Sequence, residues 1–374
     1  MELDVIDNLD KIHAVEWNRL AGHSPPLQHA FLTALHDSGA ASAKTGWIPR
    51  YLTVRKGDAL VGAMPAYEKY HSHGEYVFDW AWAEAYERYG LAYYPKILVA
   101  IPFTPVPGPR LLASCPEVRA RLVEGLGELR SAVGASSIHC LFPHEDDWPA
   151  FTQAGMMSRE GVQFHWQNQD YVNFESFLAT LNHEKRKKIR QERRKIAETG
   201  ITFEWRQGNE IRPQDWLFFE ACYRNTYALH RSTPYLNQEF FQQLGQNQSH
   251  QVCLILALRE GRPIASALNL FDSQRAYGRY WGALEYVPGL HFETCYYQSL
   301  EFCIHRGIAV FEGGAQGEHK LARGLMPTRT LSFHQLADEH FSTAVQQFLA
   351  RESQGIAHYR DELEAHGPYK KESM

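Results

Sequence analysis

Hydrophobic positions along the chain follow two different periods, which predicts a mixed α/β protein. Apolar residues recur at helical spacing in residues 12–20, 114–133, 216–229 and 292–306. Short apolar runs typical of strands occupy residues 50–67, 96–103, 136–142, 201–206, 252–271, 277–281 and 308–311. Two further helices are expected near the end, at residues 338–350 and 354–365. The chain has 374 residues, more than one core of usual size requires, so we expect two domains.

A hairpin pattern occurs once in each half of the chain. Residues 52–63 and 256–267 both contain an apolar strand, an Arg-x-Gly-polar turn and a strand of small residues. A repeat at about half the chain length predicts two related α/β domains. The polar stretch at residues 164–171 places the boundary between an N-terminal lobe, 1–166, and a C-terminal lobe, 167–374.

Composition narrows the class of protein. Apolar residues make up 44% of the chain and charged residues 22%, with a net charge of −5, as in packed globular proteins. The six cysteines are scattered without a Cys-x-x-Cys pair, so we expect neither a disulfide framework nor a metal site. No apolar run is long enough for a membrane span, and the first residues do not resemble a signal peptide. We therefore expect a soluble, cytoplasmic protein without a metal.

A strongly basic helix is expected at residues 182–199. Asn182 is placed to cap it, Gly200 to end it, and eight of its residues are Lys or Arg. One interpretation is a solvated helix with ion pairs such as Glu184–Lys188 and Glu192–Lys195. The other is a binding site for an anionic ligand, such as the phosphates of a nucleotide sugar, a cofactor or tRNA. The arginines that share one face are Arg186, Arg190 and Arg194.

Residues 312–323, EGGAQGEHKLAR, form a glycine-rich polar loop directly after a predicted buried strand. Rigid scaffolds commonly carry their chemistry on such loops. Lys320 is the candidate functional residue here, and the alternative is a surface lysine paired with Glu312 or Glu318. An aromatic block at residues 76–94 predicts either a cleft wall or an ordinary packed helix.

Longer strings resemble a known family. The blocks GEYVFDWAWAEAYERYG, IPFTPVPGPRLL, HFETCYYQSLEFCI and FEGGAQGEHKLARG are similar, in this order, to FemAB-like predicted N-acyltransferases, also called peptidoglycan biosynthesis or recognition proteins. This family is related to the Fem peptidyltransferases within the GNAT superfamily. The resemblance spans roughly residues 15–345. It implies two tandem GNAT-like domains, each a mixed, mostly antiparallel sheet flanked by helices, with acyl or aminoacyl transfer to an amine in a cleft between them.

The resemblance also implies roles for single residues. Fem enzymes carry an aromatic-Lys pair after the glycine-rich turn, where the lysine steadies the reacting carbonyl. Here the pair is His319-Lys320, so the lysine is kept and the aromatic residue becomes histidine. On the basic helix, Arg186 or Arg190 matches the position that binds substrate phosphates.

The acyl transfer implied by the resemblance needs a base, a proton donor and a donor-binding turn. Asp79, Glu84 or His319 could take the proton of the amine, although Asp79 could instead be a helix N-cap. Tyr280 could return a proton to the leaving group. The GNAT pyrophosphate signature is missing from the expected turn at residues 286–291. The donor-binding candidates at that turn are Pro288, Gly289 and His291, and the remaining substrate-binding candidates are Trp80, Trp82, Glu84, Gln316 and Glu318.

The expected function is therefore N-acyl transfer from a thioester donor to an amine of an anionic or phosphorylated acceptor. Acyl-CoA or another acyl donor would be the co-substrate, and the acceptor would be a small molecule or a cell-wall precursor. Acyl carrier protein or tRNA is a further expected partner. One alternative is an aminoacyl-tRNA-dependent peptidyltransferase acting on a peptidoglycan precursor, although the helical hairpin of many tRNA-dependent relatives is missing. The other is a non-catalytic module that recognises an anionic glycan or nucleic acid.

Overall fold

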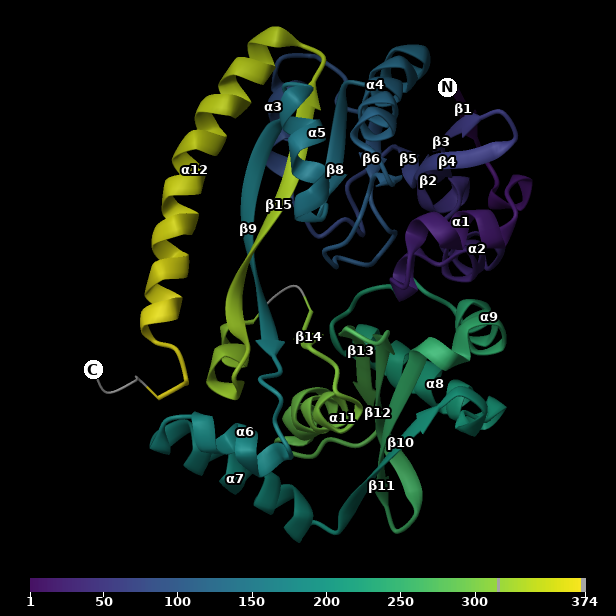
Figure 1. Cartoon of the computed structure of the whole chain (residues 1–374). Coiled ribbons are helices and arrows are strands. Elements are labelled where there is room, and N and C mark those ends of the chain that lie inside the picture. Colours follow the sequence, from purple (N-terminus) through teal and green to yellow (C-terminus); the bar gives the residue numbers. More distant parts are fainter. Residues whose placement is uncertain (315–316, 371–374) are drawn as a thin grey trace. The chain divides into compact units, whose positions relative to one another are not determined.

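The computed structural model describes residues 1–314 and 317–370 and contains two compact units (Figure 1). The first unit comprises Met1–Gly161 and Arg329–Tyr359, and the second comprises Val162–Thr328 and Arg360–Met374. The chain first passes from one unit to the other after Gly161, close to the boundary predicted after residue 166. The return of residues 329–359 to the first unit was not predicted, because it depends on strand pairing between segments far apart in sequence.

The first unit contains two sheets, with strand orders β1-β3-β4-β7 and β15-β8-β6-β5-β2. Its strands are β1 (Glu2–Ile6), β2 (Trp47–Pro49), β3 (Tyr51–Lys56), β4 (Ala59–Met64), β5 (Ala66–Lys69), β6 (Lys96–Val99), β7 (Leu112–Ala113), β8 (Ser137–Leu141) and most of β15 (Met326–Leu336). Its helices are α1 (Ala14–Ala21), α2 (His29–Asp37), α3 (Trp80–Arg88), α4 (Pro116–Val133), α5 (Trp148–Gln153) and most of α12 (Glu339–Ala365). Strand β9 (Met157–Gln167) leads from this unit into the second.

The predicted helical stripe of residues 114–133 forms the centre of the first core. Leu122 and Leu126 of α4 are fully buried, and they pack with Leu52 of β3 and Val99 of β6 in one apolar cluster. Each such side chain contributes about 1.5–3 kcal/mol by leaving water. The helix ends at Gly134, whose left-handed backbone favours glycine.

The second unit is built on a mixed sheet with the strand order β10-β11-β12-β13-β14-β9. Its other strands are β10 (Ile201–Gln207), β11 (Val252–Arg259), β12 (Arg262–Phe271), β13 (Arg275–Ala283) and β14 (Val310–Glu312). Its helices are α6 (Phe174–Thr180), α7 (His183–Glu198), α8 (Pro213–Leu229), α9 (Gln238–Gln248), α10 (Leu290–Phe292) and α11 (Gln298–Arg306). A π-helical segment, Glu293–Tyr297, joins α10 to α11, and a 3-10 turn, Glu318–Arg323, follows β14.

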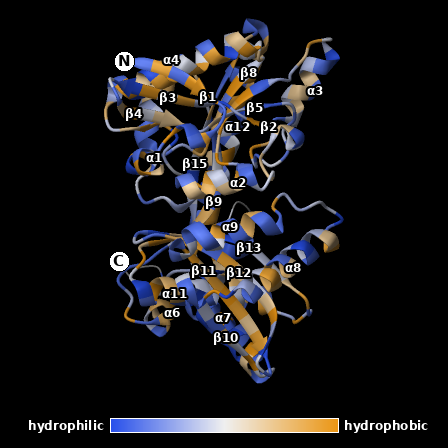
Figure 2. Ribbon diagram, turned by 90° about the vertical axis from the view of Figure 1, so that its right-hand side faces the viewer, coloured by the Kyte–Doolittle hydropathy of each residue, from blue (hydrophilic) through white to orange (hydrophobic). Residues whose placement is uncertain are grey.

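The mixed α/β class with mostly antiparallel strands is confirmed in both units. Strands β10 to β13 pair antiparallel in succession, whereas β13 and β14 run parallel, as do β6 and β8 in the first unit. Hydrophobic residues are concentrated in β11 and β12, and hydrophilic residues dominate α7 (Figure 2). Helix α8 crosses β13 at Gly282, where a Cβ atom would collide with the carbonyl group of Cys222.

The two hairpins that suggested an internal repeat share their geometry. Each has a two-residue loop, because Lys56 pairs with Ala59 and Arg259 pairs with Arg262. Each also has a register shift two residues before the end of its first strand. The hairpin geometry therefore aligns Lys56 with Arg259. In the sequence comparison of residues 52–63 with 256–267, these two residues are offset by one position.

The predicted pair of C-terminal helices is wrong. Helix α12 runs without a break over Glu339–Ala365 (Figure 1). The residues between the two predicted segments, Arg351, Glu352 and Ser353, are tolerated in a helix interior, so nothing there ends the helix. Among the helices of residues 1–314 and 317–370, none is long and apolar enough to cross a membrane.

Candidate active site

Lys320 lies in the 3-10 turn after β14 and is almost completely buried, with 2% of its surface exposed. Its ammonium nitrogen donates a hydrogen bond to the carbonyl oxygen of Gly314 at 2.9 Å. Burial lowers the pKa of Lys320 to about 8, since an ammonium group is poorly solvated away from water. The alternative of a lysine on an exposed loop therefore does not describe this residue.

The glycines before the turn allow its backbone path. Gly317 has φ 114°, which favours glycine, and a Cβ atom there would lie 2.5 Å from the ring of His319. Glu318 is exposed at the start of the turn, and Gln316 lies outside the described residues.

A cavity of about 320 Å³ lies where β13 and β14 part. The two parallel strands pair only over Arg275, Ala276 and Tyr277 of β13. Farther along, β13 continues while the chain after β14 turns into the glycine-rich loop. The cavity is lined from β13 by Gly278, Tyr280 and Trp281 and from the loop by Gly314, His319 and Lys320. Lys320 and two further predicted residues, His319 and Tyr280, are thus brought together.

The ring of His319 occupies an aromatic environment. Its centroid lies 5.7 Å from that of Tyr296 and 5.8 Å from that of Phe292. Nε2 of His319 lies 3.0 Å from the Tyr296 hydroxyl group. The His319 residue is exposed as a whole, but partial burial of its ring lowers its pKa, so the imidazole is neutral at pH 7. This histidine therefore packs as an aromatic ring and also offers a neutral nitrogen beside Lys320.

The three donor-binding candidates are not equivalent. His291 lines the cavity, and burial lowers its pKa to about 4, so it is uncharged at neutral pH. Gly289, with φ 85°, precedes α10, and Pro288 is exposed; neither is among the cavity-lining residues. Tyr280 packs its ring against Tyr223, with 5.3 Å between centroids.

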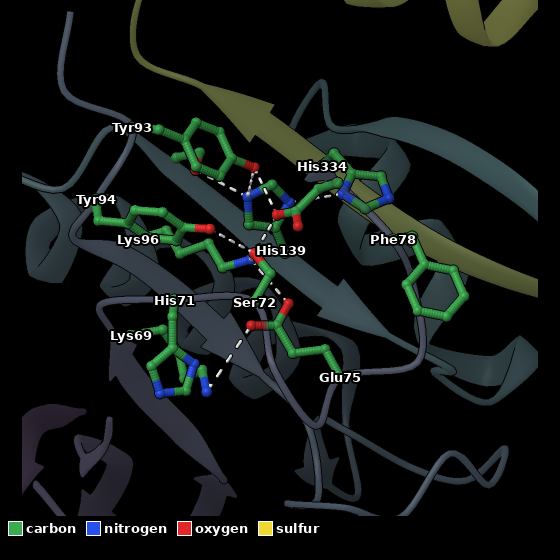
Figure 3. Close-up of polar contacts among 12 residues, drawn as sticks. Lys69, His71, Ser72, Glu75, Phe78, Tyr93, Tyr94, Lys96, His139 and His334 are labelled. Carbon is green, nitrogen blue, oxygen red and sulfur yellow. Dashed lines mark hydrogen bonds and ion pairs between the residues drawn. The ribbon is translucent and has the colours of Figure 1, made fainter. Parts of the chain in front are cut away.

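Asp79 lies in the first unit and joins a buried network of charged side chains through Lys96. Lys96, Glu75 and Lys69 of this network are labelled in Figure 3. The Asp79 carboxylate accepts hydrogen bonds from Lys96 and, at 2.7 Å, from the Tyr93 hydroxyl group. Burial alone would raise the pKa of Asp79, but the Lys96 ammonium group outweighs it and holds the pKa well below its usual range. A carboxylate stabilised in this way is a weak base. Asp79 occupies the N-cap position of α3, yet its side chain makes no capping hydrogen bond.

The network continues on both sides of Lys96. Its ammonium group also donates to Glu75 and Ser72, each at 2.8 Å. Burial raises the pKa of Glu75 to about 7 and lowers that of Lys69, 3.9 Å away, also to about 7. On the other side, Tyr93 lies 3.1 Å from Nε2 of His139.

The other candidates of the aromatic block differ in exposure. Trp80 is 42% exposed, whereas Trp82 is buried and packs edge-on against His334 with 5.0 Å between centroids. Glu84 pairs with Arg88 at 2.6 Å on the exposed side of α3. Glu84 therefore belongs to a surface ion pair.

The basic helix α7 is capped as predicted, since the Asn182 side chain accepts from the backbone N–H of Lys185. Arg190 pairs with the exposed Glu175 at 2.5 Å, and Arg194 lies 3.7 Å from Glu198. Such exposed pairs contribute little, about 0–1 kcal/mol, so a ligand can replace them. Arg186 lies on the same helix and is partly exposed.

Several contacts around this site were not predicted from the sequence. Glu192 accepts from Arg323 and Tyr297 instead of pairing with Lys195. Cys295, in the π-helical segment, lines the cavity beside Lys320. These residues come from segments remote in sequence, and no local pattern marks them. Within the described part of the chain, no group of three or more His, Cys, Asp or Glu side chains is arranged to hold a metal ion.

Comparisons with known proteins agree with the two-unit fold. The structure of FemX aligns with a TM-score of 0.57 and 10% identity, covering 92% of this chain and 100% of FemX. L-PGS from Bacillus licheniformis aligns at 0.55 and 10% identity, covering 92% and 97%. The C-terminal domain of a putative lysylphosphatidylglycerol synthetase from Agrobacterium fabrum aligns at 0.54 and 10% identity, covering 90% and 97%.

At these identities the structural likeness shows the fold alone. No curated protein matches the sequence. The profile of the FemAB-like family, described as peptidoglycan biosynthesis/recognition, matches residues 8–371. That match covers nearly the whole chain, and the chain therefore belongs to the FemAB-like family.

Proposed function

We propose that this protein is an N-acyltransferase that moves an acyl group from a thioester donor to an amine of an anionic or phosphorylated acceptor. The observation that carries the proposal is the buried ammonium group of Lys320 in the cavity between β13 and β14. A preorganised cation in a site largely removed from water stabilises negative charge that develops during a reaction. Membership of the FemAB-like family supports transfer chemistry.

The opening between β13 and β14 suits an extended donor arm. Past Tyr277, β13 no longer pairs with β14, and Gly278 and Tyr280 line the cavity there. An extended, amide-containing chain can lie along a strand, as peptide ligands of sheets do. An acyl-CoA or an acyl carrier protein carries such an arm.

In the proposed reaction the acceptor nitrogen attacks the thioester carbonyl carbon. The carbonyl oxygen gains negative charge, which the Lys320 ammonium group stabilises. His319 takes the proton that the nitrogen loses, and the C–S bond then breaks to give an amide and a thiolate. Tyr280 returns a proton to the sulfur and is reprotonated by exchange with His319 or solvent. His319 is the base that we favour, because Glu84 is in a surface ion pair and Asp79 is bound by Lys96.

The face of α7 that carries Arg186, Arg190 and Arg194 would bind the anionic part of the acceptor. The same exposed cations favour a second candidate function, in which the donor is an aminoacyl-tRNA and the acceptor a peptidoglycan precursor. The two candidates differ in the donor that the protein retains.

Donor retention tests the proposal. The purified protein is incubated separately with acyl-CoA, acyl carrier protein and aminoacyl-tRNA, and each sample is examined by native mass spectrometry. Retention of a thioester donor supports the proposal, retention of aminoacyl-tRNA supports the second candidate, and retention of none supports a recognition module.

Alkylation of two cysteines, one at the cavity and one far from it in sequence, can show where the donor binds. Of the six free cysteines, Cys115 and Cys295 are only partly buried, and Cys295 lines the cavity whereas Cys115 lies in the first unit. Burial raises the pKa of the Cys295 thiol, so Cys295 reacts slowly with iodoacetamide. A bound donor should slow alkylation of Cys295 further, relative to its own rate without donor, and leave that of Cys115 unchanged. Equal protection of both, or of neither, contradicts donor binding in this cavity.

A further inference from the structure

The basic helix α7 contacts the turn of Lys320 through an acidic residue. Glu192 accepts hydrogen bonds from the guanidinium group of Arg323 at 3.0 and 3.2 Å and from the hydroxyl group of Tyr297. Arg323 lies 131 residues farther along the chain. Glu192 therefore joins α7 to the turn after β14 and to the π-helical segment.

Arg323 is the last residue of the turn Glu318–Arg323, and its side chain holds the turn in place. Its guanidinium group also donates to the backbone carbonyl of His319 at 2.7 Å. The guanidinium carbon lies 3.5 Å from the centroid of the Phe292 ring, and only 3% of the residue is exposed. Because the bond to His319 spans the position of Lys320, the arginine closes the turn around the lysine.

This ion pair joins a buried arginine to a partly buried glutamate, and such a pair is not needed for stability alone. Desolvation of both charges offsets most of their attraction, and an apolar pair of the same size is often equally stable. The charged pair instead fixes the orientation of its partners, because a guanidinium group can bind a carboxylate and a carbonyl in fixed directions at once.

We propose that Glu192 and Arg323 are positioning residues that hold the turn Glu318–Arg323 closed over Lys320. We call these contacts the clamp: those of Glu192 with Arg323 and Tyr297, and that of Arg323 with the His319 carbonyl. The clamp keeps water from the lysine. Its catalytic meaning rests on the proposed function of Lys320. Its effect on the lysine can nevertheless be measured without any substrate.

A positioning role and a purely electrostatic role of Glu192 and Arg323 predict different changes in the pKa of Lys320. If Glu192 and Arg323 acted only through charge, loss of the anion would lower the pKa of Lys320 and loss of the cation would raise it. If they act as a clamp, loss of either opens the turn, solvates the ammonium group and raises its pKa. The titratable side chains that share the lining of this cavity with Lys320 are His291, Cys295, Tyr296, His319, Tyr280 and Arg279, and both variants leave them unchanged.

The test is the pH dependence of Lys320 acetylation by acetic anhydride, resolved by peptide mass spectrometry. The wild-type protein should give a pKa of about 8. Both Glu192→Gln and Arg323→Gln should raise it toward the ordinary value of 10.5 and speed the modification of Lys320 when rates are compared at one high pH. Glu184→Gln, an exposed acid of the same helix, is the control and should leave the pKa unchanged.

Thermal melting checks that each variant is folded, and two milder substitutions serve as further controls. Arg323→Lys keeps the charge, and Tyr297→Phe removes only one donor to Glu192, so each should raise the pKa of Lys320 in a folded protein. Opposite shifts in the two Gln variants, or an unchanged pKa in the folded variants, would overturn the clamp. When a donor is known, the variants should lower kcat by up to about 10²-fold, the loss that a misplaced group can cause, with KM little changed. A raised pKa without any donor retention would support the clamp and count against the proposed function.

Discussion

The ammonium nitrogen of Lys320 lies 2.9 Å from the carbonyl oxygen of Gly314, so the lysine reaches across the loop that follows β14. The hydrogen bond holds the cation beside the cavity between β13 and β14. Because the lysine is buried, its charge acts over a short distance with little screening by water. This arrangement suits the role that we propose for Lys320, the stabilisation of a developing oxyanion.

The first prediction concerns the pH dependence of transfer. Burial lowers the pKa of Lys320 to about 8, so the cation is present below that pH and is lost as the pH rises through it. We expect kcat to fall above pH 8. Lys320→Arg, if it retains activity, should move this decline to higher pH because the arginine stays charged. A kcat that rises through pH 8 would instead indicate a neutral lysine that acts as a base.

A second prediction separates the two roles of His319. His319→Phe keeps an aromatic ring against Tyr296 and Phe292 but removes the nitrogen that accepts a proton. Loss of a general base typically costs about 10²–10⁴-fold in rate, so kcat should fall within this range. Wild-type kcat in His319→Phe would show that the residue acts only as an aromatic ring.

The third prediction concerns the stability of the first unit. Lys96→Met removes the cation that binds Glu75 and Asp79 and leaves two carboxylates in the interior. Breaking a buried pair by removing one partner costs about 3–5 kcal/mol, and urea unfolding should show a loss of this size. Lys56→Met, in the exposed hairpin, is the control and should change the free energy of unfolding by less than about 0.5 kcal/mol. An equal, small effect of both changes would contradict the ion network.

Much of the fold was predictable because its signals are local. The stripe of Leu122 and Leu126 predicts α4, and Asn182 predicts the start of α7. The return of residues 329–359 to the first unit depends instead on pairing of β15 with β8, which no local pattern reveals. The same holds for the unbroken α12.

The candidate site was predicted in part. Resemblance to the family singled out Lys320, and the cavity brings His319, Tyr280 and His291 to it. The contacts of Lys96 with Asp79 and of Arg323 with Glu192 join segments far apart in sequence. Charged residues that are buried by tertiary contacts look like surface residues in the sequence, which is why neither pair was found there.

A fourth prediction tests the exposed face of α7. Arg186→Glu and Arg190→Glu together should raise the acceptor KM by about 10-fold or more, since two charge-assisted contacts to an anion are lost. The effect should shrink at high salt, which screens exposed charges. Arg262→Glu changes an exposed arginine at the start of β12, serves as the control and should leave KM unchanged. An unchanged KM in the double variant would mean that α7 is a solvated helix without a substrate role.

The most direct test of the central claim is the transfer rate of Lys320→Ala, measured with a donor that the wild-type protein retains. We expect kcat to fall by about 10²–10³-fold, the loss seen when a single oxyanion donor is removed. Donor retention and melting temperature should stay close to those of the wild-type protein. A Lys320→Ala protein that transfers at the wild-type rate would contradict the account.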